Sequence, residues 1–257
     1  MQLFKKDGPF AHIILNNPEK HNAFNEQLIE DITQTLKDIE QDDSIRVVLL
    51  SAEGASFSAG ADLNWMKKMA AYSAEENFAD AMKLAHLMET LNNLNKPTIA
   101  LVQGNAFGGA LGLIACCDIA LSVPTALFCF SEVKLGLIPA VISPYTITAI
   151  GERMARRYFL TAERFSAQEA LNMSLIHIIS ENLLSDGLAL AEKIAQNGPQ
   201  ALRHIKQLTR KVAQSFMNED LMQTTAKAIA EARVSQEGQE GLGAFLEKRT
   251  PNWIPNS

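Results

Sequence analysis

Two glycine-containing segments of the 257-residue chain carry backbone groups that could stabilise a negatively charged oxygen. The segment 57–62 follows the apolar run 47–50, and the segment 104–112 follows the apolar run 98–102. Glycine has no side chain to shield the backbone, and N–H groups near a helix N-terminus point toward bound anions. Two such N–H groups that converge on one oxygen would form an oxyanion hole.

The same glycine pattern could also arise from close packing or from a nucleotide-binding loop. A Gly-Gly turn between a strand and a helix more often serves close packing than catalysis. Gly104, Gly108 and Gly109 do not have the spacing of a dinucleotide-binding fingerprint, and no Gly-Lys-Ser/Thr follows as in a phosphate-binding loop. The glycine spacing therefore excludes these two nucleotide motifs and leaves packing and an oxyanion hole as alternatives.

Glu132 is the one carboxylate in the apolar stretch 128–139. An acid among apolar residues has a raised pKa and could exchange a proton near neutral pH. The alternative is a surface carboxylate at the end of a strand, paired with Lys134. The local pattern favours neither alternative over the other.

Composition narrows the class of protein. The chain has 47% hydrophobic and 20% charged residues, as an ordinary globular protein does, and its net charge of −6 argues against general nucleic-acid binding. The N-terminus lacks the apolar core of a signal peptide, and no apolar run reaches membrane-spanning length. The cysteines, Cys116, Cys117 and Cys129, lack metal-ligand spacing and fit small buried side chains in a reducing compartment. We therefore expect a cytoplasmic protein.

Strand patterns alternate with helix patterns through most of the chain, which indicates an α/β fold. After about Asn197 only helical patterns remain. We therefore divide the chain into a core, residues 1–196, and a C-terminal helical segment, residues 197–257. The predicted strands are 11–15, 47–51, 98–102, 118–122 and 126–130, and Asn25 and Ser73 are predicted N-caps of helices.

Taken together in chain order, the segments resemble the crotonase superfamily, which comprises enoyl-CoA hydratases and isomerases. The resemblance implies a spiral of ββα units with a C-terminal helical trimerisation segment, and hence a homotrimer or a hexamer built from trimers. It implies an acyl-CoA substrate and no metal or redox cofactor, since coenzyme A is part of the substrate. The matching stretches are 17–23, 57–63, 96–112, 117–120, 128–139, 160–167 and 240–249.

The resemblance also implies roles for single residues. The N–H groups of Ala61 and Gly109 would hold the thioester oxygen, and Glu132 would transfer the proton and orient water. For two of the implied binding residues we favour another role, a helix N-cap for Asp62 and a solvated surface lysine for Lys20. The residues implied in CoA and substrate binding are Lys20, Ala23, Ala59, Gly60, Asp62, Gly108, Phe245 and Lys248.

One position departs from the hydratases that use two glutamates. Their first glutamate lies three residues after the oxyanion glycine, where this chain has Gly112. Superfamily members with only the second glutamate include enoyl-CoA isomerases and bacterial hydratases of branched, carboxylated acyl-CoAs. The run 131–145, in which we expect Ser143 as a helix N-cap and Pro144 as the first helical residue, resembles bacterial methylglutaconyl-CoA hydratases most.

We therefore expect an acyl-CoA hydratase that adds water to, or removes it from, an α,β-unsaturated acyl-CoA such as 3-methylglutaconyl-CoA. A Δ3–Δ2 enoyl-CoA isomerase, in which Glu132 moves a proton between carbons, is the alternative within the superfamily. A non-catalytic acyl-CoA-binding or RNA-associated protein on the same scaffold is a third hypothesis, motivated by the missing glutamate. The two donor segments and the acidic charge argue against this third hypothesis.

Overall fold

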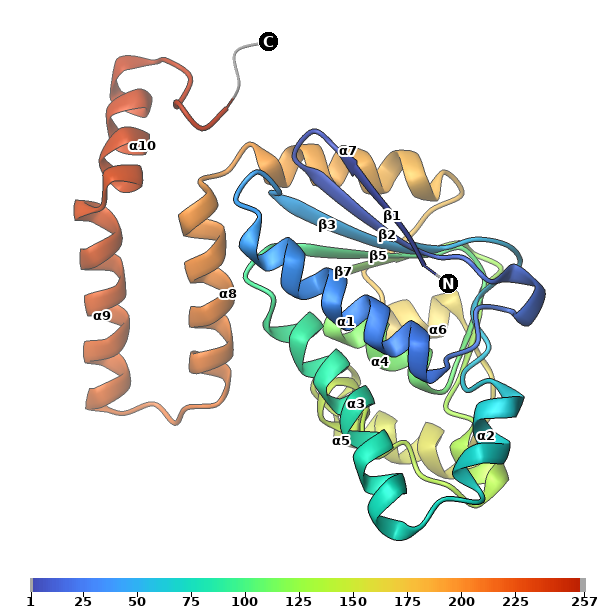
Figure 1. The fold of residues 1–257 in the computed structure, drawn as a ribbon. Coiled ribbons are helices and arrows are strands. Elements are labelled where there is room, and N and C mark those ends of the chain that lie inside the picture. The colour runs from blue at the N-terminus through green and yellow to red at the C-terminus, as the bar shows by residue number, and fades with distance from the viewer. Residues whose placement is uncertain (1, 255–257) are drawn as a thin grey trace.

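The computed structural model describes residues 2–254, and its largest feature is a six-stranded sheet (Figure 1). The first two strands of this sheet pair antiparallel, and every other neighbouring pair is parallel. In spatial order the strands are β1 (Gln2–Asp7), β2 (Phe10–Leu15), β3 (Val47–Ala52), β5 (Thr98–Val102), β7 (Ile119–Ser122) and β10 (Ile178–Ile179).

A second sheet has four short strands. Its first three strands are parallel, and the fourth pairs antiparallel with the third. In spatial order they are β4 (Ser56–Ser58), β6 (Asn105–Phe107), β8 (Leu127–Cys129) and β9 (Phe165–Ser166).

Helices fill the connections between the strands and make up the C-terminal part of the chain. Between residues 2 and 254, no helix is long and apolar enough to cross a membrane. The helices are α1 (Glu26–Gln41), α2 (Leu63–Met69), α3 (Ala74–Asn93), α4 (Gly109–Cys116), α5 (Ser143–Thr161), α6 (Ala167–Asn172), α7 (Leu183–Ala195), α8 (Pro199–Ala213), α9 (Glu219–Val234) and α10 (Gln236–Glu247), with 3₁₀ turns η1 (Pro18–Lys20) and η2 (Glu132–Leu135).

One order of elements repeats along the core. β3 and β4 are followed by α2 and α3, β5 and β6 by α4, and β7 and β8 by α5. Each turn adds one strand to each sheet and then returns through a helix. The structure therefore confirms the expected α/β fold, a spiral of ββα units.

The large sheet is covered on both faces. Alternate residues of a strand point to opposite faces, so Val48 and Leu50 of β3 pack in the main core with α1, whereas Val47 and Leu49 pack against α7. Figure 1 shows α7 on one side of the sheet and α1 on the other. Strands buried on both faces explain the continuous apolar runs by which the sequence predicted them. The cysteines are free and buried, as expected.

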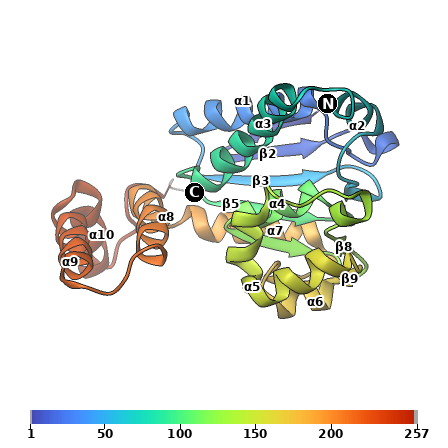
Figure 2. The same ribbon diagram turned by 90° about the horizontal axis from the view of Figure 1, so that it is seen from below.

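The C-terminal helices stand beside the core (Figure 2). The junction with α8 is polar: Lys206 Nζ lies 2.5 Å from Asp118 Oδ2 and donates to the carbonyl oxygen of Lys96 at 2.9 Å. Several apolar side chains of this segment are exposed, including Phe216 at 91% and Phe245 at 81%. No strand lies between residues 197 and 254, as predicted. The division into two parts at this point stays an interpretation.

The start of α5 corrects one prediction. The helix begins at Ser143 rather than Pro144, and Ile142 occupies the N-cap position. The Ser143 hydroxyl donates to the carbonyl oxygen of Ala140 at 2.7 Å, and among the described residues it accepts no backbone N–H group, so it does not cap the helix. The Ile142 carbonyl oxygen instead accepts the first helical bond, from the N–H of Thr146 at 3.0 Å.

Candidate active site

A cavity of about 680 Å³ lies between α2, α3 and the segment that joins β8 to α5. Besides Phe24, five parts of the chain line it: the loops before α2 and α4, the facing sides of α2 and α3, and residues 131–142. Phe24 connects two of these parts, since its backbone forms a parallel bridge with Ala61 and its ring lies beside Gly109. The fold thus brings both predicted donor segments and Glu132 to one cavity.

The N–H group of Ala61 is left free by the bridge to Phe24. The Phe24 N–H donates to the Gly60 carbonyl oxygen at 2.7 Å, and the Phe24 carbonyl oxygen accepts from the Asp62 N–H at 2.8 Å. In such a parallel bridge the flanking residues make both bonds, so Ala61 directs its own N–H to the other side. Within residues 2–254 this N–H has no protein acceptor.

The N–H group of Gly109 is free for a different reason. Gly109 is the first residue of α4, where an N–H group has no acceptor inside the helix. The preceding Gly108 has φ 57° and the glycine before Ala61, Gly60, has φ 89°. Only glycine adopts these angles without strain, so each donor follows a turn that its glycine permits. The two donors can both face an oxygen in the cavity.

Glu132 lies beside the turn that carries Gly109. A Cβ atom at Gly108 would be 3.3 Å from Glu132 Oε1, so the absence of a side chain at Gly108 makes room for the carboxylate. Glu132 Oε2 is buried and has no hydrogen-bond partner in the described part of the chain. Burial raises the pKa of Glu132, against a smaller opposing effect of a backbone hydrogen bond. The carboxylate can therefore accept or donate a proton inside the cavity.

The surface alternative for Glu132 is wrong. The residue begins the 3₁₀ turn η2 rather than ending a strand, and no ion pair joins it to Lys134 among the described residues.

Close packing leaves Gly112 no room for a side chain. A Cβ atom there would lie 2.3 Å from Ile142 Cγ2 and 3.0 Å from Met88 Sδ. The space in which a glutamate at this position would begin is thus filled by α3 and the start of α5. The packing of the core around α4 therefore excludes a glutamate side chain at this position.

Asp62 and Lys20 form an ion pair near the cavity. Asp62 caps α2 by accepting from the N–H groups of Asn64 and Trp65, which confirms the N-cap interpretation. Its other carboxylate oxygen lies 3.2 Å from Lys20 Nζ, and the Lys20 side chain is 51% exposed. Burial acts to raise the pKa of Asp62, but these hydrogen bonds outweigh it and lower that pKa.

The structure separates the other predicted binding residues into two groups. Ala59, Gly60 and Gly108 line the cavity. Ala23 is buried beside Phe24, and it does not line the cavity. Phe245 and Lys248 lie at the far end of α10, away from α2 and α3 in both views of the chain (Figures 1 and 2), and they do not line the cavity of their own chain.

A second carboxylate in the cavity escaped the sequence analysis. Asp80 of α3 is 7% exposed and accepts a hydrogen bond from Trp65 Nε1 at 3.2 Å through Oδ1. Burial raises the pKa of Asp80, while the Trp65 hydrogen bond acts in the opposite direction. Asp80 precedes Leu84 and Met88 at intervals of four residues, which places it on the buried face of α3. This four-residue spacing could have identified Asp80 as a buried carboxylate from the sequence.

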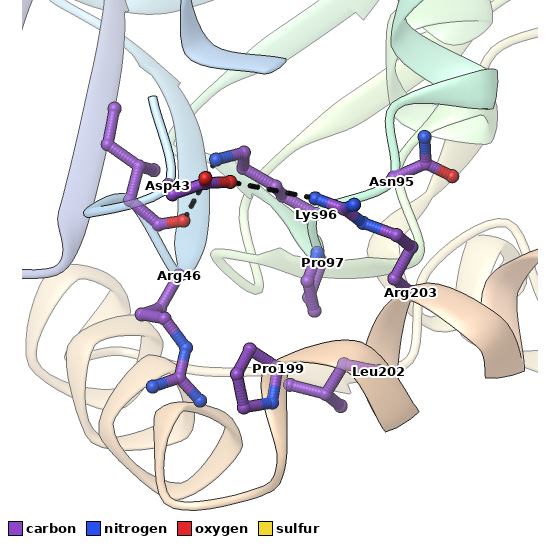
Figure 3. A pocket seen from close by; sticks show the side chains of 9 residues that line it. Asp43, Arg46, Asn95, Lys96, Pro97, Pro199, Leu202 and Arg203 are labelled. Atoms are coloured by element: carbon purple, nitrogen blue, oxygen red, sulfur yellow. Dashed lines mark hydrogen bonds and ion pairs between the residues drawn. The ribbon is translucent and has the colours of Figure 1, made fainter. Parts of the chain in front are cut away.

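A smaller pocket of about 50 Å³ lies between the core and α8 (Figure 3). Its cations already have structural partners: Lys96 Nζ donates to the carbonyl oxygen of Ile45 at 3.1 Å, and Arg203 pairs with Asp43 at 3.8 Å. A volume of this size holds only a few water molecules. This pocket therefore ties the α8 helix to the core and offers no room for a substrate.

Comparisons with known proteins agree with this geometry. Residues 6–256 match the family model described as enoyl-CoA hydratase/isomerase. The chain is 30% identical over 259 residues to the crotonyl-CoA hydratase of Syntrophomonas wolfei, covering 98% of this chain and 97% of the relative. The crystal structure of an enoyl-CoA hydratase from Shewanella pealeana matches with a TM-score of 0.96 and 48% identity, covering 98% of this chain and 95% of that one.

Proposed function

The chain belongs to the enoyl-CoA hydratase/isomerase family, and from this we propose that it hydrates an α,β-unsaturated acyl-CoA with Glu132 as the one proton-transferring carboxylate. The observation that carries the proposal is the buried, unpartnered Oε2 of Glu132 in the cavity that Ala61 and Gly109 also line. A free proton acceptor next to two unsatisfied donors is the pairing that chemistry at the carbon next to a thioester requires.

The proposed reaction begins with the thioester oxygen between the N–H groups of Ala61 and Gly109. Glu132 removes a proton from a water molecule as the water oxygen bonds to the β-carbon. The electrons of the double bond move onto the thioester oxygen as an enolate, which each N–H group stabilises by about 3 kcal/mol. Glu132 then gives its proton to the α-carbon, and the carbonyl reforms.

Isomerisation is the second candidate, and the crowding at Gly112 favours it as much as hydration. One carboxylate that shuttles a proton between the α- and γ-carbons needs no second acid. Here the enolate forms when Glu132 removes a proton from carbon, with no addition of water, and it is conjugated with the remaining double bond. The same oxyanion hole would stabilise it, and Glu132 would return the proton to the other carbon.

Two observations bear on which acyl group the site accepts. The resemblance of residues 131–145 to methylglutaconyl-CoA hydratases makes 3-methylglutaconyl-CoA the first carboxylated substrate to test. The distal carboxylate of that substrate would need a cation, and the described residues that line the cavity include no lysine or arginine. Crotonyl-CoA and 3-methylcrotonyl-CoA, which lack this carboxylate, therefore belong in the same test.

The deciding experiment is turnover of this panel by the purified protein in water enriched in ¹⁸O. Hydration is expected to consume the conjugated double bond and to place one labelled oxygen on the β-carbon. Relocation of the double bond without label, across the whole panel, would replace hydration by isomerisation. No turnover of any enoyl-CoA would contradict both.

We also propose that α8, α9 and α10 mediate assembly into a homotrimer or a hexamer of trimers. The support is the set of exposed apolar side chains in this segment: Ile229 on α9, Phe245 on α10, and Phe216 and Met217 in the loop between α8 and α9.

A further inference from the structure

Of the carboxylates in residues 2–254, two line the cavity, Glu132 and Asp80. Glu132 lies beside the oxyanion-hole turn, whereas Asp80 comes from α3 and adjoins the α2 side chain Trp65. The other side chains that α2 and α3 contribute here are mostly apolar: Trp65, Met66, Met69, Ala81 and Leu84, with Asn77 as the remaining polar one.

The Asp80 carboxylate is held in place. Its Oδ1 accepts from Trp65 Nε1 at 3.2 Å, and Trp65 itself is 6% exposed. Oδ2 accepts no hydrogen bond from any described residue, and it is not sealed from the cavity. An acyl chain that extends toward α3 thus meets apolar surface and one fixed carboxylate oxygen.

Nearby charges do not neutralise Asp80. Lys83 is the cation whose charge acts on the pKa of Asp80, and it lowers that pKa. Its Nζ already pairs with Glu30 at 2.8 Å and lies 4.0 Å from Glu26. Glu26 adds a further negative charge to the surroundings of Asp80. The described cavity wall, which also lacks histidine, supplies no cation.

We propose that Asp80 is a specificity residue that excludes acyl groups with a negative charge, so that the site takes an uncharged, apolar enoyl-CoA. The inference rests on the proposed function, because it names the class of acyl group that the same site accepts. A carboxylate on the acyl chain would lie in a cavity of low polarity with two like charges and no counter-ion. The substrate class is therefore a straight or methyl-branched hydrocarbon chain rather than a carboxylated one.

The test compares two ligands that differ in charge but hardly in shape. Glutaryl-CoA ends in a carboxylate, and its terminal amide has the same length without the charge. Both lack a double bond, so affinity can be measured by titration calorimetry whether or not the protein turns over an enoyl-CoA. We expect the wild-type protein to bind the amide at least about tenfold more tightly than the carboxylate.

Variants assign this preference to Asp80. Asp80→Asn is expected to reduce the ratio of the two affinities by at least about fivefold, mainly by tighter binding of glutaryl-CoA. Glu75→Gln removes an equal charge from an exposed position on the same helix and should leave the ratio unchanged. It is the matched control for the net charge of α3.

Each contrary result has a distinct meaning. Equal affinities in the wild-type protein would overturn the proposal, even if the Asn variant failed to fold. An unchanged affinity ratio in a folded Asp80→Asn variant would also overturn the proposal. If that variant in addition lost crotonyl-CoA turnover, Asp80 would act in catalysis rather than in specificity. If the charge preference holds but no enoyl-CoA is hydrated, the proposed function fails and the specificity of the site stands.

Discussion

At the scale of single residues, the chemistry of this site depends on how Glu132 is surrounded. Its Oε2 is buried without a partner, and its Oε1 fits beside Gly108 because that residue has no side chain. A buried carboxylate without a cation is an effective proton acceptor, since its conjugate acid is stabilised relative to the ion.

Glu132→Gln keeps the shape of the side chain and removes its ability to take a proton. We expect kcat to fall at least about a hundredfold, while the Kd of a saturated acyl-CoA stays within about threefold. Steady-state kinetics and titration calorimetry measure the two quantities. Glu152→Gln, at an exposed position of α5, is the control and should retain wild-type kcat. A near-normal rate for Glu132→Gln would move proton transfer to another group.

The pH profile follows from the direction of the pKa shift. Glu132 must be ionised to accept a proton, and burial raises its pKa from the ordinary value of 4.5. Activity should therefore fall as the pH drops through this raised pKa, with the midpoint above pH 4.5. A profile of log(kcat/KM) against pH measures it, and a midpoint at or below the ordinary value would contradict the assignment.

Gly109→Pro removes one donor of the oxyanion hole. Proline is well tolerated as the first residue of a helix, so the fold should largely survive while kcat falls at least about a hundredfold. Gly109→Ala is the control, because it keeps the N–H group and its Cβ atom would lie 3.4 Å from the Phe24 ring, an ordinary contact. Circular dichroism checks folding. Full activity in a folded proline variant would place the hole elsewhere.

At the scale of elements, the packing of α3, α4 and the start of α5 decides how many carboxylates reach the site. Gly112 of α4 lets Ile142 and Met88 approach so closely that no side chain can begin there. The same helix α3 that fills this space carries Asp80 into the cavity about two turns earlier. One change of side chain at Gly112 therefore cannot restore a second glutamate.

Gly112→Ala should destabilise the protein through this crowding. Overpacking of a core costs roughly 1–3 kcal/mol, which for a chain of this size lowers Tm by about 2 to 12 °C. Gly112→Ala combined with Ile142→Ala should lose less stability than the two single changes added together, because the second removes the atom that the first would strike. Thermal unfolding measures all three variants. Strict additivity would show that Ile142 is not the obstacle.

At the scale of the whole molecule, the C-terminal segment exposes more large apolar side chains than is typical of a surface in contact with water. Phe216 is 91% exposed and Phe245 81% exposed, on a segment joined to the core largely by polar contacts. Burial of such side chains between copies of the chain would remove them from water. A shared apolar interface is the physical basis of the proposed assembly.

Light scattering on the purified protein should therefore give the mass of three or six chains at micromolar concentration. Phe216→Asp/Phe245→Asp should shift the mass toward that of one chain, whereas Lys227→Gln, at an exposed polar position of α9, should not. A stable monomer of the wild-type protein would contradict the proposed assembly and any contribution of Phe245 and Lys248 to a neighbouring site.

Local chemistry explains what the sequence by itself determined. Largely apolar runs predicted the central strands β2, β3, β5 and β7, because strands buried on both faces need them. Side-chain oxygens predicted the N-caps at Asn25 and Ser73, since the capping bonds span only a few residues. The α/β class and the positions of the donor segments followed from such short-range rules. The order of motifs along the chain carried the resemblance to the superfamily.

Contacts between distant parts of the chain decided the rest. Of the small sheet, β8 alone was predicted, within 126–130; β4, β6 and β9 are two or three residues long, too short for a periodic signal, and they exist because neighbouring elements of the spiral pair with them. Ser143 could be the N-cap or the first residue of α5, and the fold places it as the first residue, with its hydroxyl donating to the Ala140 carbonyl oxygen. The crowding of Gly112 by Ile142 and the place of Asp80 in the cavity depend on helices that only the fold brings together. Sequence alone could therefore identify Glu132 as a candidate, while its free oxygen and the charge of its surroundings are properties of the tertiary structure.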